Sequence, residues 1–226
     1  MVKSPALMIK LIVYDLDGTL IDSSRDIADA VNWVLQNIGL KGLPPEQIRS
    51  FVGSGVTHLM RQVLENTSSP APASLLDRSI RLFRRRYAEH LLDQTVLYPS
   101  VRKVLEFFKD RRQAVVTNKP HEFSLQILKG LGVDSYFCEV IGGDQGFPKK
   151  PAPEVLLEIL RRTSVLPQES VFVGDSAIDV ETGQKAGVKT LAVTYGFGKR
   201  EEIEASRPSL LLEDLEELIP CPLLKI

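Results

Sequence analysis

Little in this sequence of 226 residues points to a secreted, membrane-spanning or nucleic-acid-binding protein. The two cysteines, Cys138 and Cys221, are too few for a disulfide framework or a four-ligand zinc site. No apolar run approaches the roughly 18 residues that a membrane span requires. Because 28 basic residues face 29 acidic ones, the net charge of −1 offers no bulk attraction for nucleic acids or anionic membranes. We expect a cytoplasmic protein without such partners, either a monomer or a homodimer.

Short apolar segments and helical patterns alternate over most of the chain. Hydrophobic residues make up 43% of the sequence, enough for a buried core. Turns after β-branched segments predict buried strands at residues 10–14, 113–116, 137–141, 170–173 and 190–193. Helices are predicted at residues 100–109, 122–131, 154–162 and 180–186. This alternation predicts an α/β protein with a Rossmann-like, doubly wound parallel sheet and helices on both faces.

The first predicted strand is followed by a long helical stretch. Ile27, Val31 and Val34 recur at helical spacing, and a second apolar stripe begins at Leu59. A stretch of about 70 residues far exceeds the dozen or so that a crossover connection needs. We therefore expect an inserted α-helical cap at residues 22–93. The catalytic α/β core then comprises residues 1–21 and 94–226.

Acidic side chains recur where predicted strands end. Asp15 and Asp17 follow the first strand, and Asp175 follows the fourth, with Asp179 four residues further on. An aspartate before a glycine is common in ordinary turns, and an aspartate before a helix is a common N-cap. Parallel strands, however, would gather these carboxylates at one edge of the sheet, where burying like charges is costly without a cation. The pattern predicts an oxygen-rich site for Mg²⁺.

Two further motifs fall at the same predicted edge. The second strand ends in Thr117 and Asn118, which before a helix also form a common N-cap arrangement. Lys149 and Lys150 precede the helix predicted at residues 154–162, where a lysine pair is usually part of a solvated loop. One ammonium group that reaches toward the carboxylates would balance part of their charge.

Taken in order, these motifs resemble the haloacid dehalogenase superfamily of phosphotransferases over nearly the whole chain. The motifs are Asp-Leu-Asp-Gly-Thr at 15–19, Thr-Asn at 117–118, Lys-Pro at 150–151 and Gly-Asp-Ser at 174–176. Further segments resemble the phosphoglycolate phosphatases of that superfamily. They are Asp-Ser at 22–23, Val-Gly-Ser-Gly at 52–55, Val-Thr-Asn-Lys-Pro at 116–120, Ile-Gly-Gly-Asp at 141–144 and Thr-Tyr-Gly at 194–196. The resemblance implies Mg²⁺-dependent hydrolysis of a small phosphorylated metabolite, 2-phosphoglycolate, to glycolate and phosphate.

The resemblance also implies roles for the acidic residues. Asp15 would attack phosphorus and form an aspartyl-phosphate. Asp17 would protonate the leaving alcohol and later remove a proton from the attacking water. The Asp15 side chain, the main-chain carbonyl of Asp17 and Asp175 would hold Mg²⁺. Asp179 would position either a metal-bound water or Lys150.

Other residues would bind the phosphate. Lys150 would place positive charge beside both the nucleophile and the phosphoryl group. Thr117 and the backbone N–H groups near Gly18 and Asn118 would hold the phosphoryl oxygens.

The cap would contact the rest of the substrate. The turn formed by Gly53, Ser54 and Gly55 allows close backbone approach, and the helix N-terminus after it favours an anion. Arg61 or Arg49 could pair with a substrate carboxylate.

Several alternatives share parts of this pattern. A receiver-type switch also surrounds an aspartate with acids, a threonine and a lysine, but it is about half this length and needs no cap. A dehalogenase of the same fold needs neither Mg²⁺ nor an acid at position 17. A β-phosphoglucomutase-like mutase shares all the core motifs, although Thr19 favours a phosphatase. A phosphatase of a sugar phosphate, a nucleotide or pyrophosphate also fits.

Overall fold

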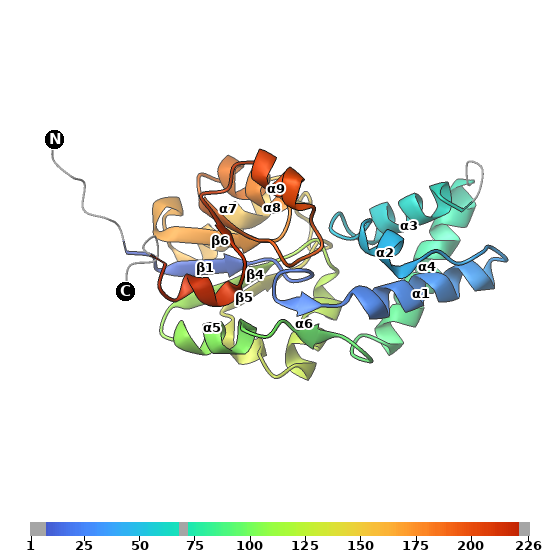
Figure 1. Cartoon of the computed structure of the whole chain (residues 1–226), viewed down its shortest axis with the longest axis horizontal. Coiled ribbons are helices and arrows are strands. Elements are labelled where there is room, and N and C mark those ends of the chain that lie inside the picture. Colours follow the sequence, from blue (N-terminus) through green and yellow to red (C-terminus); the bar gives the residue numbers. More distant parts are fainter. Residues whose placement is uncertain (1–7, 68–71, 222–226) are drawn as a thin grey trace.

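The structure, a computed structural model, describes residues 8–67 and 72–221. Within these residues the centre of the molecule is a six-stranded sheet with the strand order β5-β4-β1-β6-β7-β8 (Figure 1). The strands are β1 (Leu11–Tyr14), β4 (Arg112–Val116), β5 (Glu139–Ile141), β6 (Ser170–Gly174), β7 (Lys189–Val193) and β8 (Leu210–Leu212). Every neighbouring pair in this sheet is parallel. The predicted α/β fold is confirmed.

Helices cover both faces of the sheet. They are α5 (Val101–Phe107), α6 (His121–Gly130), α7 (Glu154–Thr163), α8 (Ala177–Lys185) and α9 (Arg200–Ala205). All four side chains of the central strand β1 are buried, as is usual for a strand that is covered on both faces. Ile12 and Tyr14 share an apolar cluster with α5 and α6, whereas Leu11 and Val13 share one with α7. Alternate side chains of β1 thus contribute to the apolar clusters on the two faces of the sheet.

Several elements of the core differ from the sequence prediction, and helix α8, predicted from residue 180, begins at Ala177. Strand β8 and helix α9 were not predicted, because Leu210–Leu212 contains no β-branched residue and α9 is too short to show a periodic pattern. The strand predicted to begin at residue 137 begins at Glu139. A short 3₁₀ helix at Asp134–Tyr136 comes before it, and the Phe137 N–H bonds back to the carbonyl of Asp134 at 3.1 Å.

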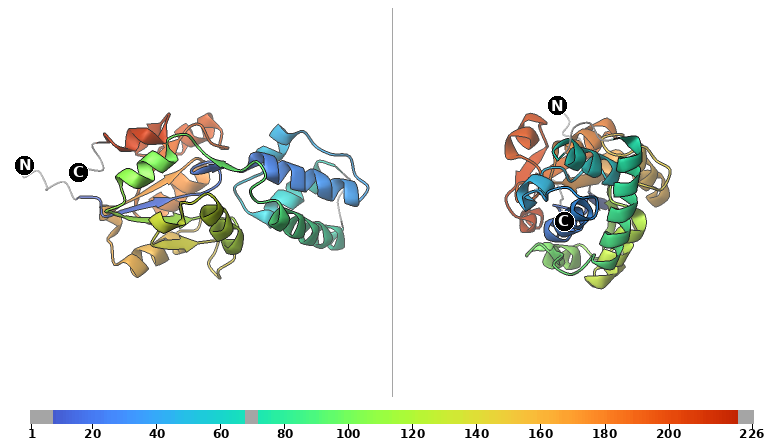
Figure 2. Two further views of the ribbon diagram at one scale, coloured as in Figure 1. Left: turned by 90° about the horizontal axis from the view of Figure 1, so that it is seen from below. Right: turned by 90° about the vertical axis from the view of Figure 1, so that its right-hand side faces the viewer.

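Four helices in the described part of residues 24–89 form a group beyond the carboxyl end of β1 (Figure 2). They are α1 (Ser24–Asn37), α2 (Pro45–Arg49), α3 (Val56–Glu65) and α4 (Ala73–Glu89). The apolar stripe on α1 is buried, as the helical spacing predicted. Helix α1 packs against α2 and α4, and α3 packs against α4. Their buried apolar side chains belong to the same cluster as those between the sheet and α5 and α6. We call this helical group the cap.

A two-stranded ribbon joins this helical group to the sheet. Strand β2 (Ile21–Asp22) pairs antiparallel with β3 (Val96–Leu97), so the outgoing and returning chains lie side by side. Asp26 at the start of α1 is buried and accepts hydrogen bonds from the N–H groups of Gln94 and Thr95. It also accepts one from the Thr95 hydroxyl at 2.7 Å. One carboxylate thus ties the first cap helix to the returning chain.

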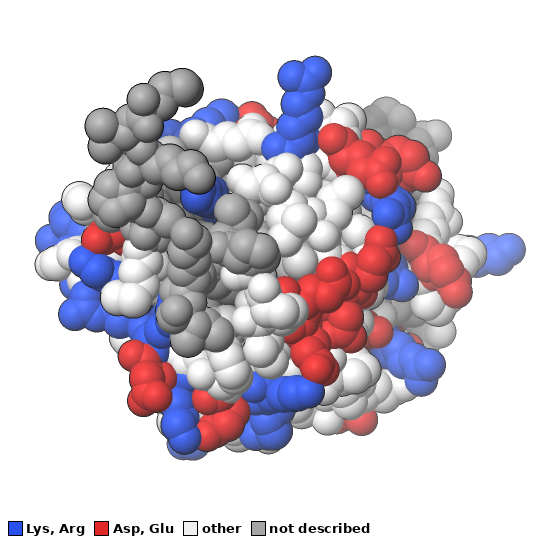
Figure 3. Space-filling model, turned by 60° about the vertical axis from the view of Figure 1, so that its left-hand side comes forward, with Lys and Arg blue, Asp and Glu red and all other residues white. Residues whose placement is uncertain are grey.

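The surface carries charges of both signs. On the face shown in Figure 3, lysine and arginine side chains are interspersed with aspartate and glutamate, although acidic residues gather in one band. This distribution agrees with the near-zero net charge. No helix in the described part of the chain combines the length and the hydropathy that a membrane crossing requires.

Candidate active site

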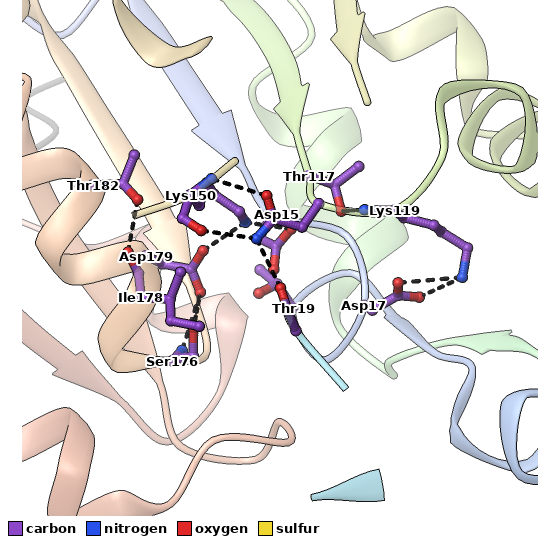
Figure 4. A network of polar contacts seen from close by, with 12 residues as sticks. Asp15, Asp17, Thr19, Thr117, Lys119, Lys150, Ser176, Ile178, Asp179 and Thr182 are labelled. Atoms are coloured by element: carbon purple, nitrogen blue, oxygen red, sulfur yellow. Dashed lines mark hydrogen bonds and ion pairs between the residues drawn. The ribbon is translucent and has the colours of Figure 1, made fainter. Parts of the chain in front are cut away.

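The strand-end residues that the sequence suggested meet at one edge of the sheet (Figure 4). Strand β1 is followed by Asp15, β4 by Thr117 and β6 by Asp175, and β1 pairs with both β4 and β6. The Asp15 N–H still donates to the Val173 carbonyl at 2.8 Å, so the sheet register extends to this aspartate. Thr117 and Asp175, which lie 102 and 160 positions after Asp15 in sequence, are therefore brought to one place.

Lys150 forms the centre of the polar network. Its Nζ lies 2.7 Å from Asp15 Oδ1 and 2.7 Å from Asp179 Oδ1, and its side chain is buried. Burial by itself lowers the pKa of Lys150, but the Asp15 and Asp179 carboxylates outweigh that effect and hold the pKa above its ordinary value. Lys150 is therefore a fixed positive charge beside Asp15.

Three carboxylates lie around this lysine, and we call Asp15, Asp175 and Asp179 the carboxylate cluster. One oxygen from each lies within 4.8 Å of the others, and all three residues are buried. Burial raises the pKa of Asp15. Burial also raises the pKa of Asp175, with further contributions from the Asp179 and Asp15 charges. Burial is the largest cause of both raised pKa values, so both carboxylates are costly to keep ionised without a nearby cation.

The carboxylate cluster fits a divalent cation. Lys150 offsets one of three negative charges, and a divalent cation would offset the other two. Carboxylate oxygens are the ligands that hard cations such as Mg²⁺ prefer. Backbone packs tightly around Asp175, because a Cβ atom on Gly18 would lie 2.2 Å from its Oδ2 and one on Gly196 would lie 2.4 Å from the same oxygen. The Phe197 N–H donates to that oxygen at 2.6 Å, which fixes its position.

Asp179 has a structural partner as well as Lys150. Its Oδ2 accepts hydrogen bonds from the Ser176 N–H at 3.1 Å and the Ser176 hydroxyl at 2.6 Å. These bonds form a capping box at the start of α8, which anchors this aspartate to the helix N-terminus. Its Oδ1 faces Lys150, so Asp179 holds the lysine in place as well as contributing charge.

The Asp17 side chain points away from the carboxylate cluster. Its Oδ1 and Oδ2 lie 2.9 and 3.2 Å from Lys119 Nζ, and Oδ1 also accepts a hydrogen bond from the Ser23 hydroxyl at 2.6 Å. The Lys119 ammonium also donates to the Tyr87 hydroxyl at 2.7 Å. Of the oxygens of Asp17, only the main-chain carbonyl therefore remains for a cation at the cluster.

Lys119 is a site residue that the sequence reasoning missed. It stands within the Val-Thr-Asn-Lys-Pro segment, but a lysine at a strand end is usually solvated, and its burial depends on contacts distant in sequence. The structure leaves it only 6% exposed. Burial lowers the pKa of Lys119, but the Asp17 carboxylate and the Tyr87 hydroxyl outweigh that effect and hold the pKa above its ordinary value.

Asn118 organises the backbone around Lys150. Its Oδ1 accepts a hydrogen bond from the Lys150 N–H at 2.9 Å, and its Nδ2 donates to the Lys150 carbonyl at 3.1 Å. The same Nδ2 lies 2.9 Å from the Gly53 carbonyl in the cap. Thr117 stands beside it, with its hydroxyl accepting a hydrogen bond from the Lys119 N–H at 3.2 Å. The Thr-Asn motif thus links the lysine to the cap.

Two cavities between cap and core border Asp15 and Asp17. The smaller, of about 40 Å³, has largely apolar walls from the cap, and Gly53 and Gly55 line it. The larger, of about 410 Å³, is lined by Ser54, Gly53 and Asp175. Gly55 lies close to the core, because a Cβ atom there would stand 2.4 Å from Lys149 Nζ. The three predicted cap residues therefore border the site.

The two cap arginines considered for a substrate carboxylate line neither cavity. Arg61 is exposed on α3. Arg49 Nη2 donates to the Gly196 carbonyl at 2.7 Å, and its guanidinium lies 4.9 Å from the centre of the Phe197 ring. Arg49 is thus a cap-to-core contact in this structure.

A parallel sheet with an acidic pair after its first strand, a buried lysine and a helical cap defines a class of α/β hydrolases. The chain belongs to the haloacid dehalogenase-like hydrolase family, whose model matches residues 12–193.

Named relatives cover most of the chain. A phosphoglycolate phosphatase of Pseudomonas putida is 38% identical over 221 residues, which are 96% of this chain and 80% of the relative. One of Chromobacterium violaceum is 36% identical over 214 residues, which are 93% and 96% of the two chains. The crystal structure of a predicted phosphoglycolate phosphatase from Haemophilus somnus has a TM-score of 0.90 and 29% identity, and the alignment covers 94% of this chain and 97% of that one.

Proposed function

We propose that this protein is a Mg²⁺-dependent phosphatase that hydrolyses 2-phosphoglycolate to glycolate and phosphate. The observation that carries the proposal is the position of the buried Lys150, whose Nζ lies 2.7 Å from Oδ1 of both Asp15 and Asp179. Asp175 completes the carboxylate cluster. The relatives named phosphoglycolate phosphatase, at 38% and 36% identity, support the substrate. A cytoplasmic location remains part of the proposal.

Asp15 is the proposed nucleophile. One of its carboxylate oxygens attacks phosphorus, the bond from phosphorus to the leaving oxygen breaks, and that oxygen takes the electron pair. Lys150 lies against Asp15 and orients it while offsetting its charge. The carboxylate cluster and the Asp17 main-chain carbonyl would hold Mg²⁺, and the ion would supply positive charge against the repulsion between Asp15 and the phosphate dianion.

Asp17 is the proposed acid and base. It gives a proton to the leaving oxygen, so that glycolate departs as the alcohol, and then takes a proton from the water that hydrolyses the aspartyl-phosphate. Its side chain borders the smaller cavity, outside the carboxylate cluster, as this role requires. Thr117 and the backbone N–H groups near Gly18 and Asn118 would bind the phosphoryl oxygens.

The helical group at residues 22–93 is the proposed cap domain over the core of residues 1–21 and 94–226. Gly53, Ser54 and Gly55 lie at the cavities, where glycine lets the backbone approach a substrate closely.

The test is phosphate release from a panel of phosphate compounds with and without Mg²⁺. We expect 2-phosphoglycolate to have the highest kcat/KM among 2-phosphoglycolate, glucose phosphates, nucleotides and pyrophosphate. Asp15→Asn should abolish turnover with all of them and retain the wild-type circular dichroism spectrum. A higher kcat/KM for pyrophosphate or a nucleotide would contradict the proposed substrate, and turnover by Asp15→Asn would contradict the nucleophile.

A further inference from the structure

Lys119 and Tyr87 are buried beside the proposed acid but have no role in the mechanism so far. Lys119 Nζ donates to both oxygens of Asp17, at 2.9 and 3.2 Å, and to the Tyr87 hydroxyl at 2.7 Å. The ammonium also lies 4.7 Å from the centre of the Tyr87 ring. A buried ion pair loses much of its Coulombic gain to desolvation, so stability alone is a weak reason for this pair.

The contacts of Asp17 determine where its carboxyl group points. The Ser23 hydroxyl bonds to Oδ1 at 2.6 Å from one direction, while Lys119 spans both oxygens from another. A general acid must lie within hydrogen-bond reach of the leaving oxygen, and small misplacements are costly. Lys119 is therefore placed to restrict the orientation of Asp17.

Tyr87 brings the cap into this arrangement. It lies on α4, and its ring packs 5.3 Å from Phe83 in a stacked geometry and 5.6 Å from Phe123 edge-on. Phe83 belongs to the cap, whereas Phe123 and Lys119 belong to the core. The ammonium thus has two hydrogen bonds within the core and one to the cap. Only when α4 lies against the core does Lys119 have all three partners.

We propose that Lys119 is a positioning residue that aims the Asp17 carboxyl at the leaving oxygen, and that Tyr87 completes this arrangement when the cap lies on the core. The inference rests on the role of Asp17 in the proposed function. It predicts that loss of either side chain impairs protonation of the leaving group, with less effect on the attack by Asp15.

The test compares kcat/KM for three small substrates, because this ratio covers all steps up to departure of the leaving group. Phosphoglycolate and ethyl phosphate release alkoxides that need a proton, whereas acetyl phosphate releases acetate, which does not. Phosphoglycolate carries a carboxylate on its leaving group, and the other two do not. Spontaneous hydrolysis of acetyl phosphate is subtracted.

For Lys119→Met we expect kcat/KM to fall about 10²-fold with phosphoglycolate and ethyl phosphate but less than about 3-fold with acetyl phosphate. A fall confined to phosphoglycolate would overturn the inference, because Lys119 would then bind the substrate carboxylate. Equal falls with all three substrates would also overturn it, because they indicate general disruption. Lys119→Arg, which keeps the positive charge, should recover part of the kcat/KM that Lys119→Met loses with phosphoglycolate and ethyl phosphate.

Tyr87→Phe keeps the ring packing, so it tests the proposal even where Lys119→Met folds poorly. We expect the same substrate pattern with a loss of about 5-fold, the value of one hydrogen bond of about 1 kcal/mol. Arg84→Gln is the matched control, because Arg84 lies one turn away on α4 and contacts the core at Asp144 at 2.9 Å. Arg84→Gln should leave the ratio of kcat/KM for ethyl phosphate to kcat/KM for acetyl phosphate unchanged. If this ratio fell as much as in Tyr87→Phe, the role of Tyr87 would be overturned.

The two proposals fail in different ways. A wild-type protein that hydrolyses ethyl and acetyl phosphate but not phosphoglycolate refutes the proposed substrate. The Lys119 inference would then still be decided by the ratio of the other two substrates.

Discussion

At the scale of single residues, a short stretch of backbone gives two aspartates different neighbours. Asp15 ends β1 and faces Lys150 at 2.7 Å, whereas Asp17 faces Lys119 at 2.9 Å (Figure 4). Gly18 follows with a φ of 87°, a conformation that glycine adopts without strain. The spacing of the two acids predicted a paired role, but their lysines come from different places, Lys119 after β4 and Lys150 from the loop before α7.

Gly18→Ala is expected to weaken Mg²⁺ binding and activity by about 10-fold or more. A Cβ atom there would stand 2.2 Å from Asp175 Oδ2, and forcing such a contact apart costs about 1–3 kcal/mol. The measurements are the Mg²⁺ concentration for half-maximal phosphate release and calorimetric titration of Mg²⁺.

Gly39→Ala is the matched control for this substitution. Gly39 has a similar φ of 77°, but nothing lies within 4 Å of an added Cβ atom. Both substitutions therefore force alanine into a positive φ, and they differ in whether the added Cβ atom meets Asp175. Equal losses of Mg²⁺ affinity in the two variants would contradict the close approach of Gly18 to the site.

At the scale of secondary structure, regular patterns were predicted well and short elements were not. The five predicted strands and the helices between them are present, because buried strands and amphipathic helices leave periodic patterns in the sequence. The ribbon strands Ile21–Asp22 and Val96–Leu97 are only two residues long and carry no such pattern. Their pairing depends on the packing of cap against core.

Asp26→Ala is expected to destabilise the joint between cap and core. The buried carboxylate accepts hydrogen bonds from two backbone N–H groups and one hydroxyl of the returning chain. Each buried donor left without a partner costs about 1–3 kcal/mol. We expect a lower midpoint of thermal unfolding and faster limited proteolysis near residues 93–96.

Asp29→Ala provides the comparison on the same helix. Asp29 is exposed and accepts a hydrogen bond from the Gln94 side chain at 3.0 Å. We expect its unfolding free energy to stay within about 0.5 kcal/mol of the wild type. If Asp29→Ala were as destabilised as Asp26→Ala, the buried hydrogen bonds would not be the cause.

At the scale of the whole molecule, cap and core meet through contacts around the site. Asn118 bonds to the Gly53 carbonyl, Arg49 bonds to the Gly196 carbonyl, and Arg84 pairs with Asp144. Gly196 also lies against Asp175, because a Cβ atom added to Gly196 would lie 2.3 Å from the Asp175 Cβ. Gly196 therefore contacts both Arg49 of the cap and Asp175 of the carboxylate cluster. A shift of this loop would affect both the cap contact and the cation site.

Removal of divalent cations is expected to stop phosphate release and lower thermal stability. The carboxylate cluster holds three buried acids against one lysine, and a bound cation relieves their repulsion. Mg²⁺ at 100 times its Kd should stabilise the folded state by about 2.7 kcal/mol. The measurement is thermal unfolding in EDTA and after Mg²⁺ is restored.

Two variants show whether this stabilisation comes from the cluster. Asp175→Asn removes one cluster carboxylate and should lose most of the Mg²⁺-dependent shift. Asp144→Asn removes an acid that pairs with Arg84 outside the cluster and should retain the shift. An equal shift in Asp175→Asn would place the cation elsewhere.

The sequence by itself determined the α/β class, the main strands and helices and the acids at the strand ends, because these features depend on local patterns and on the order of short motifs. Tertiary structure alone decided which charges face each other. Lys119 and Asp17 stand 102 positions apart, and Tyr87 approaches them from a cap helix. Such contacts depend on how separate elements pack, which leaves no local pattern in the chain.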